Sequence, residues 1–325
     1  MPNMLICMSR IGLVLGGGGV TGAAFGFGAL FGLEMATGWD ADDAEVVVGT
    51  SSGALVGAVL RAGKLAIDTL VGEEEVDGEL PASLAGALYR RTRPTGWTRW
   101  IRHGLAPGLR NPGIQLAVGS PALYTTSGVS EWLEDLVGPL AHGWPERPTI
   151  VVAYEMEGRR RVAFGTVGSP DVPLASAVSA SSAVPMVFAP VAINGRRYVD
   201  GGVASGTSAD LVLGAESPLD LVVVVAPMAS LAKRPRSRFY EGVVDRLGAS
   251  ALGREIDRVT TAWPEADILV LRPDAEVLSE ARSNPLSAQA AIPVFLATLA
   301  SMRTRLASPE IWPILERHLL VPGHR

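Results

Sequence analysis

Glu45-Val-Val-Val-Gly-Thr-Ser-Ser-Gly-Ala-Leu-Val-Gly-Ala-Val-Leu-Arg-Ala62 is the stretch of this 325-residue chain that decides its fold. The run Glu45–Val48 predicts a short buried strand, and the small residues of Ala54–Ala62 predict a helix that follows a glycine-flanked turn. Ser51 lies at the centre of that turn, in the pattern Gly-x-Ser-x-Gly. This pattern is typical of a nucleophile elbow, which presents a serine hydroxyl at a helix N-terminus. Ser51 could equally act only as the cap of its helix.

The elbow would also supply a binding site for negative charge. The helix dipole favours an anion at its N-terminus, and the amide N–H of Ser52, the residue after the candidate nucleophile, can donate to a developing oxyanion. Ser51 and Ser52 are therefore the first two candidate site residues.

A second glycine-rich turn precedes the elbow. The predicted strand Ile11–Leu15 runs into Gly16-Gly-Gly-Gly-Val-Thr-Gly22, and a predicted helix, Ala23–Leu33, follows. Backbone N–H groups of such a turn can approach either a permanent anion such as phosphate or an oxyanion that forms only in a transition state. Residues 17–22 also satisfy the dinucleotide pattern, but that interpretation expects an acid at the end of the second strand, where this chain has Gly49-Thr50-Ser51.

A serine hydroxyl needs a base, and the histidines are poorly placed to provide one. None of the four lies in a glycine-rich or strand-end context; they are His103, His142, His318 and His324. A carboxylate is favoured instead, because Tyr198-Val-Asp-Gly-Gly202 ends a predicted strand in an acid followed by two glycines. Asp200 could take the serine proton directly, or it could simply order its loop as an Asx turn.

Taken together, Gly16–Gly22, Gly49–Gly53 and Asp200–Gly202 resemble the patatin-like phospholipases in their order and separation. The resemblance includes Ala180–Pro185 and Phe188–Val191, so it covers roughly residues 11–227.

The resemblance implies an α/β fold that hydrolyses fatty-acyl esters of lipids through a Ser–Asp dyad and an acyl-enzyme. Carried over by position, Ser51 is the nucleophile, Asp200 the base that activates it, and the amides of Gly17, Gly18 and Gly19 the oxyanion donors, to which the elbow adds Ser52. No metal or cofactor is implied.

The chain departs from the family pattern at two places. Thr21 stands where the family often has Arg or Lys, and Val203–Gly206 stands where it tends to have Asn. These departures bear on substrate class and rate more than on fold.

The remaining patterns predict a three-layer α/β/α sandwich with a mostly parallel central sheet. Residues 1–325 are expected to form a single domain, with core motifs over 11–227, an insertion or lid at about 61–125 and a helical region at about 240–325. Further strands are predicted at Thr149–Tyr154, Arg161–Phe164, Arg197–Val199, Leu219–Val225 and Asp267–Leu271, and helices near Val129–Val137, Tyr240–Trp263, Ala288–Leu306 and Glu310–Leu319.

The composition narrows the class of protein. With 48% hydrophobic residues the chain can bury a large core, and a single cysteine, Cys7, excludes an internal disulfide and favours a reducing compartment. The net charge of −5 argues against nucleic acid as a partner. The longest apolar runs, such as Leu221–Pro227, are short for a transmembrane helix, and the N-terminus lacks the layout of an export signal. We therefore expect a cytoplasmic protein that is either soluble or peripheral to a membrane. The preference for arginine over lysine is typical of GC-rich bacterial genomes.

The segment 90–110 combines cations with aromatic residues. Residues 80–130 hold six arginines and no acid, and Trp97, Trp100, Ile101 and Leu105 fall near helical spacing. Such a segment could contact an anionic membrane, cover the active site as a lid, or pack on the core with its arginines solvated.

Two other functions stay open from the sequence. An ordinary α/β-hydrolase esterase would use His318 or His324 as its base, and a catalytically weak or silent protein would keep the glycine turn to bind a lipid or a phosphate. The sequence does not fix acyl-chain length, headgroup or oligomeric state.

Overall fold

The computed structural model describes residues 9–65, 85–109, 114–232, 239–281 and 284–321. Within these ranges, an eight-stranded mixed sheet runs through the centre in the order β10-β9-β1-β2-β5-β8-β7, with β6 paired to β5. Strands β10, β9, β1, β2 and β5 are parallel, whereas β6 and β8 run antiparallel to β5, and β7 antiparallel to β8. The strands are β1 Ile11–Leu15, β2 Val46–Thr50, β5 Thr149–Glu155, β6 Arg160–Phe164, β7 Val191–Ile193, β8 Arg196–Asp200, β9 Leu221–Val225 and β10 Asp267–Leu271. A short hairpin pairs β3 (Arg90–Arg91) with β4 (Tyr124–Thr125).

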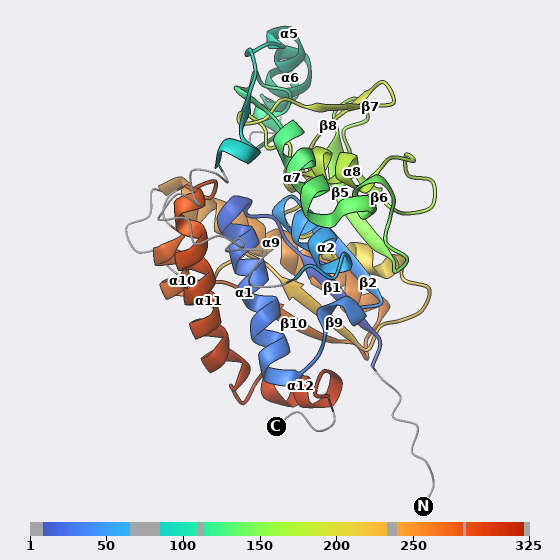
Figure 1. Cartoon of the computed structure of the whole chain (residues 1–325), viewed down its shortest axis with the longest axis vertical. Helices are drawn as coiled ribbons and strands as arrows, with labels where there is room; N and C mark the ends of the chain where they lie inside the picture. Colours follow the sequence, from blue (N-terminus) through green and yellow to red (C-terminus); the bar gives the residue numbers. More distant parts are fainter. Residues whose placement is uncertain (1–8, 66–84, 110–113, 233–238, 282–283, 322–325) are drawn as a thin grey trace, which may run out of the picture.

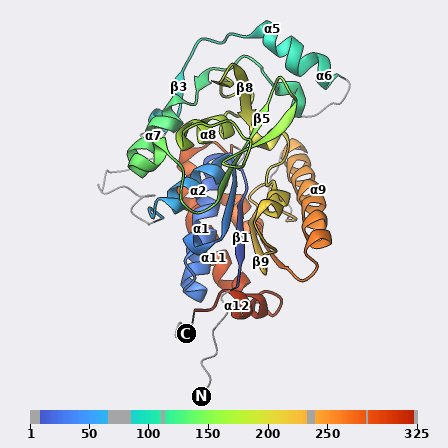
Figure 2. The same ribbon diagram turned by 90° about the vertical axis from the view of Figure 1, so that its right-hand side faces the viewer.

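Helices cover both faces of the sheet, as Figure 2 shows. One face packs against α1 (Gly19–Thr37), α2 (Ser52–Arg61), α7 (Ser127–Val137), α8 (Leu174–Ser181) and α11 (Ala291–Leu306), and the other against α9 (Phe239–Ala262) and the 3-10 helix Ala209–Gly214. The helices α10 (Ala275–Glu280) and α12 (Trp312–His318) complete the C-terminal part. The predicted three-layer α/β/α sandwich is therefore confirmed.

The valine-rich strands are explained by burial on both sides. Along β1, Leu13 and Leu15 face the core beneath α1 and α2, while Val14 faces the core beneath α9. Strand β9 alternates in the same way, with Val222 and Val224 on the α9 side. A strand covered on both faces has an apolar residue at every position, so its sequence shows a continuous run.

Helix α1 is long and apolar enough to cross a membrane by length and composition, and it is the one such helix in the described part of the chain. The apolar length of α1 was not predicted from the sequence, because glycine and alanine interrupt its runs of large apolar residues. In the fold, 56% of its most apolar window is buried. A Cβ on Gly28 would lie 2.8 Å from the Cβ of Thr298, and one on Gly32 would lie 2.7 Å from that of Met302, so these glycines let α11 approach closely. This packing accounts for the composition of α1 as a core helix.

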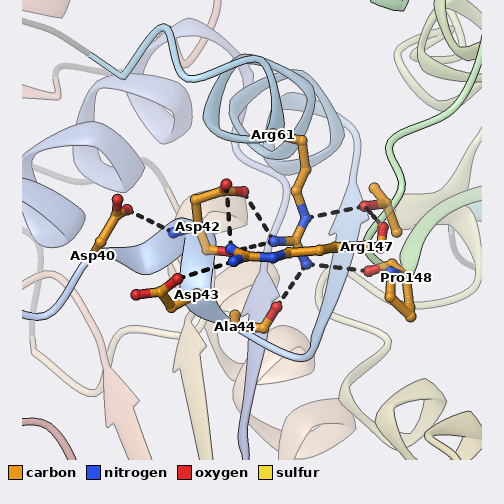
Figure 3. Close-up of polar contacts among 8 residues, drawn as sticks. Asp40, Asp42, Asp43, Ala44, Arg61, Arg147 and Pro148 are labelled. Atoms are coloured by element: carbon orange, nitrogen blue, oxygen red, sulfur yellow. Dashed lines mark hydrogen bonds and ion pairs between the residues drawn. The ribbon is translucent and has the colours of Figure 1, made fainter.

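A buried arginine ties the C-terminal end of α2 to the start of two strands. Figure 3 shows Arg61, whose side chain is only 1% exposed, donating to the carbonyl oxygens of Asp42, Ala44 and Pro148. It also donates to the Asp42 carboxylate and to Thr149 Oγ1. Because residues 42–44 lead into β2 and residues 148–149 open β5, this one guanidinium fixes α2 against the edge where both strands begin.

Most elements lie close to their predicted bounds, and the differences have physical causes. The predicted strands Ile11–Leu15 and Asp267–Leu271 match the structure, while the strand predicted at Glu45–Val48 extends over Val46–Thr50. Helix α8 was not predicted, because its small residues are buried on nearly every side and show no amphipathic period. Of the predicted insertion at 61–125, residues 66–84 and 110–113 lie outside the described residues; the single-domain division remains a proposal.

Candidate active site

Strands β2 and β8 meet head to head along one edge of β5. Thr50, the last residue of β2, pairs with Val152, and Asp200, the last residue of β8, pairs with Ala153. Strand β6 occupies the other edge of β5. Because β2 is parallel to β5 and β8 antiparallel, the two chains run toward each other and leave the sheet at adjacent positions. Sheet pairing therefore brings Ser51, the residue after Thr50, next to Asp200.

Ser51 has the strained backbone of a nucleophile elbow, with φ 56° and ψ −125° at the start of α2. Its N–H donates to Ser181 Oγ at 2.8 Å, and the residue is 6% exposed. The flanking glycines are required by close approach: a Cβ on Gly53 would lie 1.9 Å from the Leu15 carbonyl oxygen, and one on Gly49 would lie 2.5 Å from the Cα of Ala54. A conformation of this kind costs about 1–3 kcal/mol and persists only where the surroundings hold it.

Asp200 is buried, and burial raises the pKa of its carboxyl group from 3.8 to about 6. Two hydrogen bonds oppose this shift, one with the Ser51 side chain and one from the Gly202 amide, whose nitrogen lies 2.7 Å from Oδ1. A carboxyl group with such a pKa is mostly ionised at neutral pH and still basic enough to accept a proton. Ser51 and Asp200, predicted separately from the sequence, are thus brought together.

The segment after α8 holds both residues. Ser181 Oγ accepts from the Ser51 N–H and donates to the Val152 carbonyl oxygen at 2.6 Å. Two residues later, the Ala183 carbonyl oxygen accepts from the Asp200 N–H at 3.0 Å. Ala180–Pro185 is part of the family resemblance, but no role for Ser181 was predicted from the sequence. A hydroxyl at the end of an otherwise small and apolar run was the signal that could have identified it.

The predicted oxyanion donors divide into two groups. The N–H of Gly17 donates to the Gly206 carbonyl oxygen at 2.8 Å. It is therefore not free to donate to an oxyanion in this structure. The N–H groups of Gly18, Gly19 and Ser52 have no acceptor among the described residues. They lie at the N-termini of α1 and α2, where helix dipoles favour negative charge.

The glycine turn lies directly against the elbow. A Cβ on Gly17 would lie 2.8 Å from the Cβ and 3.6 Å from the Oγ of Ser51. Gly18 is confined in the same way, since a Cβ there would lie 2.8 Å from the Cα of Gly22. The sequence therefore needs glycine at 17 because the two turns touch, and at 18 because the glycine turn packs on its own Gly22, not only because an anion approaches them.

The two departures from the family pattern stabilise the glycine turn in their own way. The Thr21 hydroxyl lies at a donor distance of 3.4 Å from the carbonyl oxygens of Gly18 and Pro285, which ties the turn to the segment before α11. Ser205 Oγ accepts from the amides of Thr207 and Ser208 and shapes the loop that carries the Gly206 carbonyl.

Glu255 of α9, which the sequence analysis did not identify, supports the same loop. This buried carboxylate accepts from Thr207 Oγ1 at 2.6 Å and from the Ala209 N–H at 2.9 Å. Its sequence context, the middle of a long helix, offered no signal for this role.

The histidines lie away from the dyad. His318 lies at the opposite edge of the sheet, with its Nε2 2.9 Å from Asp267 at the start of β10 and its Nδ1 2.9 Å from Ser9 Oγ. His103 Nε2 lies 3.4 Å from the Arg197 guanidinium, and His142 ends a 3-10 helix before β5. His324 lies outside the described residues. His318 therefore cannot be the base for Ser51.

No group of three or more metal-ligating side chains (His, Cys, Asp or Glu) is found among the described residues. The polar groups around Ser51 are instead hydroxyls, amides and one carboxyl group, a donor set suited to acyl transfer.

Comparisons with known proteins identify the family of the chain. The sequence model of the family described as patatin-like phospholipase matches residues 13–213. The chain is 28% identical over 214 residues to uncharacterized NTE family proteins of Mycobacterium bovis and of two strains of Mycobacterium tuberculosis. These alignments cover 66% of this chain and 48% of each relative, so the chain spans about half the length of the curated relatives it matches. The crystal structure of VipD from Legionella pneumophila aligns over 97% of this chain and 71% of that chain, with 14% identity and a TM-score of 0.34. On the family match and the fold together, the chain belongs to the patatin-like phospholipase family.

Proposed function

We propose that this protein is a serine lipid acyl hydrolase that cleaves fatty-acyl esters of lipids, including phospholipids, through Ser51 and Asp200. Family membership supports lipid acyl hydrolysis in general terms. The observation that carries the finer proposal is the strained Ser51 elbow beside a buried carboxyl group with a pKa of about 6.

In the proposed acylation step, Ser51 Oγ attacks the ester carbonyl carbon while its proton passes to the Asp200 carboxylate. The oxyanion that forms accepts hydrogen bonds from the N–H groups of Gly18, Gly19 and Ser52. When the intermediate collapses, the bond to the leaving alcohol breaks, and Asp200 donates its proton to that oxygen. The products of this half-reaction are the free alcohol and an acyl group on Ser51.

In the deacylation step, water attacks the acyl carbon and Asp200 accepts the proton that water loses. Collapse of the second intermediate breaks the bond to Ser51 Oγ, which takes the proton back from Asp200 and leaves a free fatty acid. Both half-reactions use one carboxyl group, so no histidine is needed.

Ser52 provides a matched control for the nucleophile. Its side-chain oxygen is buried and has no hydrogen-bond partner within the described residues, while its N–H is a proposed oxyanion donor. Ser52→Ala keeps that N–H, so it should retain turnover and covalent labelling by a fluorophosphonate probe. Ser51→Ala should lose both while remaining folded.

The test therefore measures labelling and hydrolysis of a panel of phospholipids, lysophospholipids and glycerides by the wild type, Ser51→Ala, Ser52→Ala and Asp200→Asn. A folded Ser51→Ala protein that keeps full ester turnover would exclude the proposal. Wild-type protein that resists the probe and leaves every ester intact would instead favour a silent lipid- or phosphate-binding role.

A further inference from the structure

The segment that carries α5 (Trp97–Trp100), a π-helical turn (Ile101–Leu105) and α6 (Ala106–Gly108) has one anchored face. Trp100 Nε1 donates to the Leu116 carbonyl oxygen at 2.7 Å, and Arg99 Nε donates to the Gly119 carbonyl oxygen at 3.1 Å. A Cβ on Gly104 would lie 2.5 Å from the Val118 carbonyl oxygen, so the backbone itself packs on this neighbour. The segment is therefore held in a defined orientation.

The opposite face leaves large apolar side chains in solvent. Trp97 is 61% exposed, Ile101 55% and Leu109 78%. Trp97 and Ile101 are four residues apart on a helical backbone and so lie on the same side. Aromatic and aliphatic side chains of this size are rarely left exposed together unless they contact a partner.

Cations lie close to these apolar side chains in the sequence. Arg91, Arg93 and Arg102 are exposed, and none of them forms an ion pair within the described part of the chain. Residues 80–130 contain no Asp or Glu at all, although the whole chain has a net charge of −5. The positive charge is therefore concentrated on this segment. We call Arg91, Arg93, Trp97, Ile101, Arg102 and Leu109 the Trp97 surface.

The Trp97 surface lies at the same end of the sheet as the dyad. His103, in the π-helical turn, lies 3.4 Å from Arg197 of β8, three residues before Asp200. Beneath it, Val118 packs in one buried cluster with Val199 and Val203, on either side of Asp200. Figures 1 and 2 show α5 and α6 at the end of the molecule opposite both termini.

We propose that the Trp97 surface docks the protein on an anionic lipid bilayer, with Trp97, Ile101 and Leu109 in the interface and the arginines against the headgroups. This proposal names the surface on which the active site would work. It rests on the proposed function only because lipid hydrolysis gives the protein a reason to bind a bilayer. Exposed apolar side chains and exposed cations on one segment match a negatively charged surface with an apolar interior. The segment lies in the interface plane, since its helical turns are too short to span a bilayer.

The test uses Ser51→Ala protein, so that lipids stay intact, and measures sedimentation with two kinds of vesicle. One contains phosphatidylcholine alone, and in the other roughly a third of the lipid is phosphatidylglycerol. We expect binding to the mixed vesicles that weakens with salt, and much weaker binding to phosphatidylcholine. Trp97→Ser/Ile101→Ser should reduce the partition coefficient at least about tenfold, and Arg102→Gln about fivefold.

Matched controls separate the surface from general stickiness. Leu247 and Leu296, on α9 and α11, are 64% and 57% exposed, so Leu247→Ser/Leu296→Ser removes similar apolar exposure elsewhere. Arg303→Gln, at an exposed position on α11, removes one cation far from α5 in the sequence. Both controls should bind mixed vesicles like the parent protein. Equal losses in the controls, or no loss in Trp97→Ser/Ile101→Ser, would overturn the proposal, as would burial of this surface between two copies of the chain in solution.

A second readout locates the surface in the bilayer. Brominated lipids should quench part of the tryptophan fluorescence, and Trp97→Phe, which keeps an aromatic anchor, should bind normally but show less quenching. Hydrolysis of a water-soluble monomeric ester, measured on the same substitutions with Ser51 intact, should be unchanged. If the parent protein fails to bind the mixed vesicles while the wild type still hydrolyses the soluble ester, this inference alone is rejected. If the parent protein binds the vesicles but the wild type hydrolyses no ester, only the proposed function is rejected.

Discussion

Asp200→Asn is expected to make the protein more stable, by an amount that grows with pH. Burial raises the pKa of Asp200 from 3.8 to about 6, a shift that corresponds to about 3 kcal/mol. Between these two values the folded state holds the proton more tightly than the unfolded chain, so the free energy of unfolding falls as pH rises. The penalty is absent below about pH 4 and fully developed above about pH 7. An asparagine keeps the shape and the hydrogen bond from Gly202 without carrying the charge.

The assay is denaturant unfolding of the wild type and Asp200→Asn, followed by circular dichroism, from about pH 4.5 to about pH 7.5. The difference in unfolding free energy between the two proteins should widen by about 2 kcal/mol across this range, since about 1 kcal/mol of the penalty has already developed at about pH 4.5. Asp210→Asn is the matched control with the opposite sign. Burial raises the pKa of Asp210, but hydrogen bonds and charge from Arg161 and Arg258 outweigh it and leave that pKa lowered. Its removal should therefore destabilise the fold, and more at neutral than at acid pH.

A pH-independent difference for Asp200→Asn, or a variant less stable than the wild type at neutral pH, would refute the claim that a buried, charged carboxyl group is maintained beside Ser51. Stability and catalysis are linked at Asp200, because the same desolvation that costs folding free energy makes this carboxylate a stronger base.

Three further predictions follow from other contacts. The kcat/KM of ester hydrolysis should rise with pH through about 6 and then level off, because the pKa of Asp200 is raised by burial to about 6 and the base must be ionised; a rate independent of pH around that value would contradict this. Ser181→Ala should lower kcat about tenfold with little change in KM, because it removes the acceptor for the Ser51 N–H, while Ser182→Ala should retain the wild-type rate; steady-state kinetics on a soluble ester distinguishes the two. Arg61→Lys should cost about 2–3 kcal/mol of unfolding free energy, since an ammonium cannot satisfy all the buried carbonyls. The control Arg147→Lys, at a half-exposed side chain, should cost under about 1 kcal/mol. Equal losses of the two variants in denaturant unfolding would argue against the Arg61 contacts.

The fold could be predicted from the sequence wherever burial on both faces left a continuous apolar run. Ile11–Leu15 is such a run, and the edge strand Asp267–Leu271 buries only Leu269 and Leu271 fully; the bounds of both were predicted correctly. The elbow at Ser51 was recognisable for a related reason, because crowding against Leu15 and Ala54 forces glycine on both sides. Periodicity and the glycine pattern of a tight turn can be recognised within a short window of sequence.

Contacts between distant segments could not be predicted in the same way. The direction of the Gly17 N–H depends on Gly206, whose loop is held by Glu255 of α9, and no local pattern encodes that chain of contacts. Ser181 was missed because a buried hydroxyl among alanines has no period. The hydrogen bonds from Gly17 to Gly206 and from Ser51 to Ser181 each join positions more than a hundred residues apart, which one sequence does not reveal.

Because β2 and β8 both pair with β5, strand β5 sets the distance between the nucleophile and its base. One residue inserted or deleted between Val152 and Ala153 would change the spacing of the nucleophile and its base and would turn every later side chain of the strand to the other face. The turns of α5 and α6 lie outside this sheet junction and carry no such register constraint. Changes in length should therefore be tolerated better there than within the seven residues of β5.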